Sequence, residues 1–96
     1  MKYKVVFLGE AERQMENIAF YIGLDSLSMA RKFIMEMRRF FFARLSNFPL
    51  AAPKVKGEIR MLPYKRYGIL YIVDESLMLV KVLHIISGGQ DWSEWN

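Results

Sequence analysis

The side chains best suited to chemistry in this sequence are one histidine, His84, and the bases Arg60, Lys65 and Arg66. An imidazole titrates near neutral pH, so His84 could take up or release a proton. The three bases could bind the phosphates of a nucleic acid or the carboxylates of an acidic protein. Because the chain has no cysteine and a single histidine, we expect no disulfide, no cysteine nucleophile, no metal site and no cofactor.

The same four residues also have purely structural interpretations, which the sequence leaves open. His84 lies near the end of a strand-forming apolar run, where a histidine with satisfied hydrogen bonds is a common structural feature. Arg60, Lys65 and Arg66 could equally be solvent-exposed residues of a strand and a turn. Their placement therefore depends on the elements that carry them.

The hydrophobic pattern predicts these elements. Apolar residues at helical spacing predict helices over residues 10–23 and 27–47, joined by a short loop. Runs of β-branched and aromatic residues predict strands over 2–8, 58–62, 67–73 and 77–86. A loop with two prolines is expected over 48–57.

The predicted order β-α-α-β-β-β indicates an α+β fold in a single domain, residues 1–96. A helical hairpin is expected to pack on a mainly antiparallel four-stranded sheet. The last three strands are expected to form a meander, and the first strand to join the sheet edge or lie beside the last strand. Arg60 then lies on the first meander strand, Lys65 and Arg66 in the next turn, and His84 near the end of the last strand.

Aromatic residues add a second kind of candidate. Phe40, Phe41 and Phe42 together cover about 200° of a helix, which is more than one buried stripe. Phe41 falls on the expected core stripe, so at least one neighbour is expected on an outer flank. Exposed apolar residues mark partner sites, although the proline-containing loop could instead fold over them. Trp92 and Trp95 are expected to dock on the core as a C-terminal lid.

Charge is unevenly distributed along the chain. Residues 31–66 carry ten Lys and Arg against two acids, a net charge of +8, whereas the remainder carries four bases against eight acids, a net charge of −4, and the sum is +4. This asymmetry indicates an acidic or polyanionic partner for one face, although a solvated basic surface would give the same pattern. The longest apolar region, 69–86, is interrupted by charges, so we expect no membrane span, and a cytoplasmic protein without a signal peptide.

Taken in order, these residues resemble the ParE/RelE superfamily of bacterial toxins from type II toxin–antitoxin modules, over about residues 3–86. The matching positions are 3–7, Ala11, Met15, Ile18, Tyr21, Ala30, Phe33, Leu45, Pro49, Ile59, Arg60, Leu62, 67–73, Val80, Val82, Leu83 and His84. The resemblance implies the fold described above. It also implies a cognate antitoxin that wraps the helical hairpin and the sheet edge, and that makes the DNA contacts of the complex.

Two activities occur in the superfamily. RelE-like members are ribosome-dependent mRNA endoribonucleases with a cluster of bases on the sheet, whereas ParE-like members inhibit DNA gyrase and lack that cluster. The RNase pattern has two bases on the first meander strand, an arginine after the tyrosine of the central strand and another after the last strand. Here these positions read Glu58 and Arg60, then Gly68, then a stretch over 85–90 without a base. An RNase would have to rely on Arg60 and His84 alone.

The resemblance therefore favours a ParE-like toxin that binds DNA gyrase rather than an enzyme. ParE-like sequences often carry two arginines after the histidine, whereas this chain has Ile85 and Ile86 there. A RelE-like endoribonuclease and a non-toxic relic that binds only its antitoxin remain alternatives. The candidate target-binding residues are Arg60, Lys65, Arg66 and His84. The candidate antitoxin-binding residues are Met29, Phe40, Phe42, Lys54 and Lys56.

Overall fold

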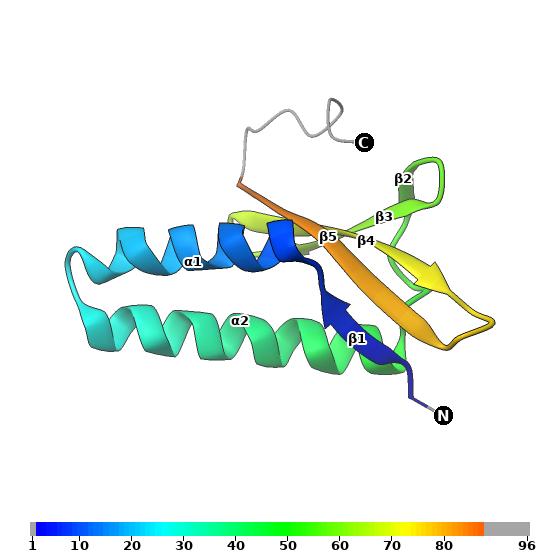
Figure 1. Ribbon diagram of the computed structural model, residues 1–96, viewed down its shortest axis with the longest axis horizontal. Helices are drawn as coiled ribbons and strands as arrows, with labels where there is room; N and C mark the ends of the chain where they lie inside the picture. Colours follow the sequence, from blue (N-terminus) through cyan, green and yellow to red (C-terminus); the bar gives the residue numbers. More distant parts are fainter. Residues whose placement is uncertain (1, 88–96) are drawn as a thin grey trace.

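In the computed structural model, which describes residues 2–87, two long helices pack against one face of a sheet (Figure 1). The helices are α1 (Gly9–Gly23) and α2 (Leu27–Asn47), and the strands are β1 (Lys4–Phe7), β2 (Lys54–Lys56), β3 (Ile59–Tyr64), β4 (Tyr67–Asp74) and β5 (Leu79–Ser87). The α+β class and the helical hairpin are confirmed. Trp92 and Trp95, which we expected to cover the core, lie outside the described residues.

The sheet has five strands in the order β1-β5-β4-β3-β2, one strand more than the sequence predicts. β3, β4 and β5 form the expected antiparallel meander, and β1 lies at the edge, parallel to β5. The additional strand, β2, pairs with the start of β3, where Lys54 lies opposite Arg60. A strand of three residues between a proline and a glycine carries too little pattern to be predicted, so the loop expected over 48–57 is shorter than predicted.

β3 continues to Tyr64, two residues beyond its predicted end, and passes through Pro63. β2 pairs only with the first residues of β3, so Pro63 lies on an open edge, where its missing N–H removes no hydrogen bond between strands. The predicted turn over 63–66 is therefore reduced to its last two residues. Lys65, the first of them, adopts a positive φ of 54°.

Local sequence explains where the helices begin and end. The Ser26 hydroxyl accepts a hydrogen bond from the Met29 amide at 3.2 Å and so caps the start of α2. At the other end, the Phe48 amide still donates to the Arg44 carbonyl at 2.8 Å. α2 therefore has the limits that the sequence predicts, residues 27–47.

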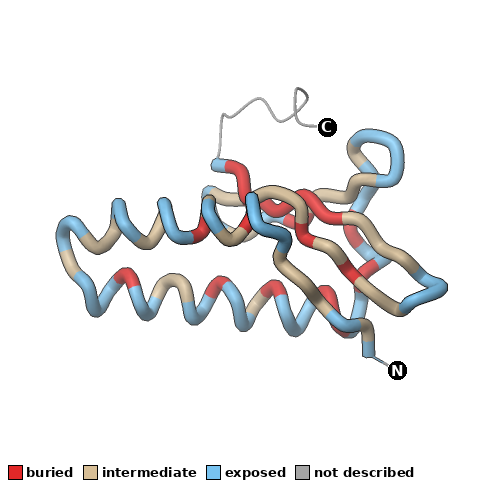
Figure 2. Tube along the Cα trace, in the orientation of Figure 1, coloured by how far each residue is buried: buried red, intermediate tan, exposed pale blue. Residues whose placement is uncertain are grey.

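The core lies between the hairpin and the sheet, where the buried positions of both layers meet (Figure 2). Its largest fully buried side chains are Tyr71, Phe41, Met15, Met37, Leu45, Ile69, Val80 and Val82. The end of the hairpin at which α1 meets α2 projects beyond the sheet (Figure 1). Large apolar residues there stay exposed, namely Phe20, Tyr21, Leu24, Leu27 and Met29.

Within residues 2–87, neither helix is long and apolar enough to cross a membrane.

Candidate functional site

Arg60, the base proposed for target binding and for catalysis, lies on the helix-facing side of the sheet. It pairs with Tyr71 of β4, a core residue, and residues directly opposite each other on neighbouring strands share a face. Its Nη1 atom donates to the carbonyl of Leu50 at 3.1 Å and to the carbonyl of Ala52 at 2.6 Å. The guanidinium therefore holds the loop over 48–53, a role that the sequence does not reveal.

His84 lies on the opposite face of the sheet. It pairs with Leu70 of β4, which pairs with Met61 of β3, and these residues alternate with core positions along their strands. The imidazole is half-buried, and its Nδ1 atom is fully buried. Burial holds the pKa of His84 below its usual value, and the nearby carboxylate of Glu10 opposes part of that shift. The imidazole of His84 is therefore neutral at neutral pH.

Arg60 and His84 thus point to opposite sides of the sheet and do not meet at one site. On the His84 face, Gly68 occupies the position at which the RNase pattern has an arginine. A Cβ atom at Gly68 would lie 3.0 Å from the Met61 sulfur, so Met61 already fills this space. Within residues 2–87, the positions of Arg60, Gly68 and His84 therefore do not form the basic cluster of the RNase pattern.

Lys65 and Arg66 form the turn between β3 and β4. The Lys65 Nζ atom lies 5.5 Å from the ring centroids of both Phe33 and Tyr64, within the range of a cation–π contact. Arg66 is exposed to solvent beside it. This turn therefore presents positive charge next to the sheet-facing side of α2.

Lys54 and Lys56 lie on β2, beside the first residues of β3. The Lys54 ammonium is 3.2 Å from the Glu58 carboxylate in an exposed ion pair. The six residues of β3 separate this region from the turn at Lys65 by about 20 Å. The bases between 54 and 66 therefore form two groups at opposite ends of β3, and not one cluster.

An apolar groove, here called the hairpin groove, runs along the outer side of α2. A hollow of about 590 Å³ between α1 and α2 continues into one of about 470 Å³ beside the second half of α2, and Arg38 lines both. Met35 and Phe42, two turns apart, are 53% and 55% exposed and make the groove apolar over this length. The remaining lining residues are Lys2, Glu16, Ala19, Phe20, Leu27, Ala30, Arg31, Ile34, Arg39, Ala43, Ser46 and Asn47.

The aromatic candidates divide between core and surface as expected. Phe41 is fully buried, and Phe42 lies on an outer flank, in the hairpin groove. The Phe40 ring packs against the rings of Phe41 and Tyr64, with centroids 5.5 and 4.8 Å apart, so it supports the core more than the surface. Met29 is exposed near the start of α2, about 20 Å along the helix from Phe42.

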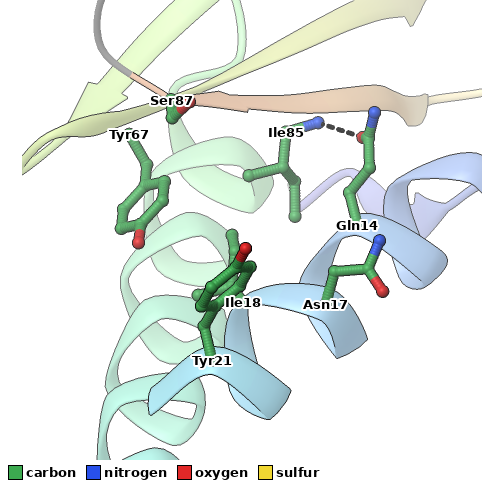
Figure 3. Close-up of a pocket in the computed structure, with 7 residues that line it drawn as sticks. All are labelled: Gln14, Asn17, Ile18, Tyr21, Tyr67, Ile85 and Ser87. Atoms are coloured by element: carbon green, nitrogen blue, oxygen red, sulfur yellow. Dashed lines mark hydrogen bonds between the residues drawn. The ribbon is translucent and has the colours of Figure 1, made fainter.

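A further hollow of about 300 Å³ lies between α1 and the adjoining ends of β4 and β5 (Figure 3). Tyr21 and Tyr67 point toward each other across it, and the Gln14 side chain reaches β5. There its Oε1 atom accepts a hydrogen bond from the Ile85 amide at 2.6 Å. Sequence reasoning missed this site, because a glutamine on a helix gives no sign of a partner 71 residues away.

Comparison with known proteins identifies the family. The family model described as the ParE toxin of the type II toxin–antitoxin system, parDE, matches residues 5–92. The chain belongs to the ParE toxin family. No curated protein matches its sequence.

Solved toxin structures share its fold. The chromosomal ParDE system from P. aeruginosa superposes with a TM-score of 0.75 at 14% identity, covering 90% of this chain and 96% of that one. The toxin–antitoxin complex RelBE2 from Mycobacterium tuberculosis gives 0.72 at 19% identity, covering 91% and 99%. The isolated E. coli RelE toxin gives 0.64 at 15% identity, covering 96% and 93%. The ParE member therefore has the architecture common to ParE and RelE toxins.

Proposed function

We propose that this ParE family member is a toxin that inhibits DNA gyrase by binding to it. The observation that carries the proposal is the separation of Arg60 and His84 on opposite faces of the sheet. RNA cleavage needs a base that takes the proton of the 2′-hydroxyl and a cation that stabilises the phosphorane, both at the same phosphate. Arg60 and His84 do not form such a pair, which supports inhibition by binding.

In this proposal residues 1–96 form one toxin domain that acts in the cytoplasm. Target binding involves the exposed turn at Lys65 and Arg66 and the sheet face that carries His84. Arg60 contributes indirectly, because its guanidinium is engaged with the carbonyls of Leu50 and Ala52.

The second part of the proposal is neutralisation by a cognate antitoxin, through which the complex also binds DNA. We assign the antitoxin to the hairpin groove, whose apolar surface around Met35 and Phe42 is open to solvent. Arg31 and Arg39 flank that surface, and Arg38 between them is paired with the Glu12 carboxylate at 2.6 Å. An amphipathic segment with acidic side chains complements the remaining positive charge. Lys54 and Lys56, the other basic candidates for the antitoxin, lie on β2 at the far edge of the sheet and do not line this groove.

Two assays with the purified protein test the proposed activity. The first measures supercoiling of relaxed plasmid by DNA gyrase, and the second measures cleavage of mRNA on translating ribosomes. We expect concentration-dependent loss of supercoiling and intact mRNA. Addition of the antitoxin should restore supercoiling, which separates specific inhibition from non-specific binding of a basic protein to DNA.

Other outcomes identify the alternatives. Ribosome-dependent cleavage without gyrase inhibition would contradict the proposal and indicate a RelE-like endoribonuclease. Inactivity in both assays, together with normal growth after induction in cells, would indicate a relic that retains only antitoxin binding.

A further inference from the structure

The loop over residues 48–53, between α2 and β2, exposes two large apolar side chains. Phe48 is 65% exposed and Leu50 is 44% exposed. Pro49, which lies between them, and Ala52, which follows them, are buried. A hollow of about 380 Å³ lies beside the loop, between α2 and β3, and Phe40, Phe48 and Met61 are among its lining residues. The loop thus combines projecting apolar groups with a cavity that an apolar side chain could fill.

Side chains of the sheet hold this loop in place. The Arg60 guanidinium donates to the carbonyls of Leu50 and Ala52, at 3.1 and 2.6 Å. The buried Tyr71 hydroxyl donates to the Pro49 carbonyl at 2.7 Å. Burial raises the pKa of Tyr71, which keeps this hydroxyl protonated and able to donate.

Backbone hydrogen bonds fix the two ends of the loop. The Phe48 amide donates to the Arg44 carbonyl at 2.8 Å, and the Met61 amide donates to the Pro53 carbonyl at 3.2 Å. A loop held at both ends and in its middle loses little conformational entropy when a partner binds. Such preorganisation favours tight binding through the side chains that the loop presents.

Charge around the loop indicates the chemistry of its partner. Residues 44–60 carry four bases, Arg44, Lys54, Lys56 and Arg60, against one acid, Glu58, so the net charge is +3. A partner segment with apolar side chains flanked by carboxylates complements both the hollow and this charge. Nucleic acid complements the charge alone, because the hollow is lined mainly by apolar side chains.

We infer that the surface formed by Phe48, Leu50 and the adjoining hollow contacts the target protein of the toxin, through an apolar segment flanked by acidic residues. This inference rests on the proposed function and adds an apolar contact to the target contacts proposed at Lys65, Arg66 and His84. Phe40 and Arg44, which line the hollow, lie about 200° around α2 from Phe42 of the hairpin groove. The toxin therefore has separate surfaces for its target and its antitoxin.

The experiment compares the wild-type protein with a Phe48→Ser/Leu50→Ser variant in the gyrase supercoiling assay. A Leu24→Ser/Leu77→Ser variant is the matched control, because these leucines are 66% and 67% exposed but lie outside the loop and the hollow. Thermal unfolding of all three proteins checks that each is folded. We expect the loop variant to need at least about tenfold more protein for half-inhibition, and the control variant to match the wild type.

Each result decides the inference. Unchanged inhibition by the folded loop variant would overturn it while leaving gyrase inhibition intact. If the loop variant lost binding to a single-stranded RNA oligonucleotide but still inhibited gyrase, the loop would be assigned to nucleic acid binding. That result would also overturn the inference. A wild-type protein that does not inhibit gyrase would instead refute the proposed function, and this is seen before any variant is compared. An Arg60→Met variant, which leaves Phe48 and Leu50 in place, should show a smaller loss of the same kind.

Discussion

Arg60 illustrates how one side chain can position a surface without being part of it. One guanidinium nitrogen bridges two carbonyls of the loop that presents Phe48 and Leu50. Hydrogen bonds from a charged donor are stronger than neutral ones, and their loss leaves the two carbonyls without this partner. The contribution of Arg60 is therefore expected in stability as well as in target binding.

The substitution Arg60→Met should lower the free energy of unfolding by about 1–3 kcal/mol, because the aliphatic stem is kept and the two hydrogen bonds are lost. Urea denaturation measures the change. Arg66→Met is the control, since Arg66 is exposed in a turn, and a change there should stay within about 0.5 kcal/mol. Equal effects of the two substitutions would show that the loop does not depend on Arg60.

His84 should make stability depend on pH. Burial lowers the pKa of His84 in the folded protein, and the Glu10 carboxylate opposes part of this shift. In the unfolded chain the imidazole takes up its proton at about pH 6.5. As the pH falls below that value the unfolded state binds more protons, so the free energy of unfolding decreases. Urea denaturation between about pH 7.5 and 5.5 should show a steeper loss for the wild type than for His84→Gln. Parallel pH profiles would contradict this assignment.

At the scale of elements, a side chain of α1 binds the part of the β5 edge that β1 does not pair with. β1 pairs with β5 only as far as Val82, and the Gln14 side chain then accepts the Ile85 amide. An unpaired edge amide would otherwise be open to another strand. The contact also fixes the first half of α1 against the end of β5.

Gln14→Leu should therefore destabilise the fold by about 1–2 kcal/mol, because it removes a hydrogen bond and leaves the Ile85 amide unsatisfied. Amide hydrogen exchange should accelerate at Ile85 more than at Val80, which lies within the paired part of β5. Asn17→Leu, one turn further along α1 and exposed, is the control and should leave the exchange of both amides unchanged. Identical exchange in wild type and Gln14→Leu would exclude the contact.

The same elements show which features a sequence can predict. The limits of α2 follow from apolar spacing and from the Ser26 cap, both of which are local. β2 could not be predicted, because three residues acquire strand geometry only by pairing with β3. The engagement of Arg60 and the exposure of Phe48 could not be predicted either, since both depend on how a loop folds back onto the sheet. The candidate residues were therefore recognisable by type, but their grouping was not.

For the whole molecule, the basic middle of the chain is divided between two sides. Arg31 and Arg39 flank the hairpin groove on the outer side of α2, where Arg38 is paired with Glu12, whereas Arg44 lines the hollow beside the loop over 48–53 and Lys54 follows that loop. The net charge of +8 over residues 31–66 is thus spread over these two surfaces and the turn at Lys65 and Arg66, and is not gathered in one patch. Two acidic protein partners could then bind at different places, which makes toxicity and neutralisation separable by mutation.

The variant Met35→Glu/Phe42→Glu places two carboxylates in the hairpin groove and tests this separation. Both residues are more than half exposed, so the free energy of unfolding should change by less than about 0.5 kcal/mol. Affinity for the antitoxin, measured by titration calorimetry, should fall at least about tenfold, because the apolar contact is lost and acidic side chains repel an acidic partner. Gyrase inhibition should persist and should no longer be reversed by the antitoxin. The Phe48→Ser/Leu50→Ser variant should behave in the opposite way, with its affinity for the antitoxin retained and its inhibition of gyrase lost. If either variant lost both properties in parallel, the two partners would share one surface.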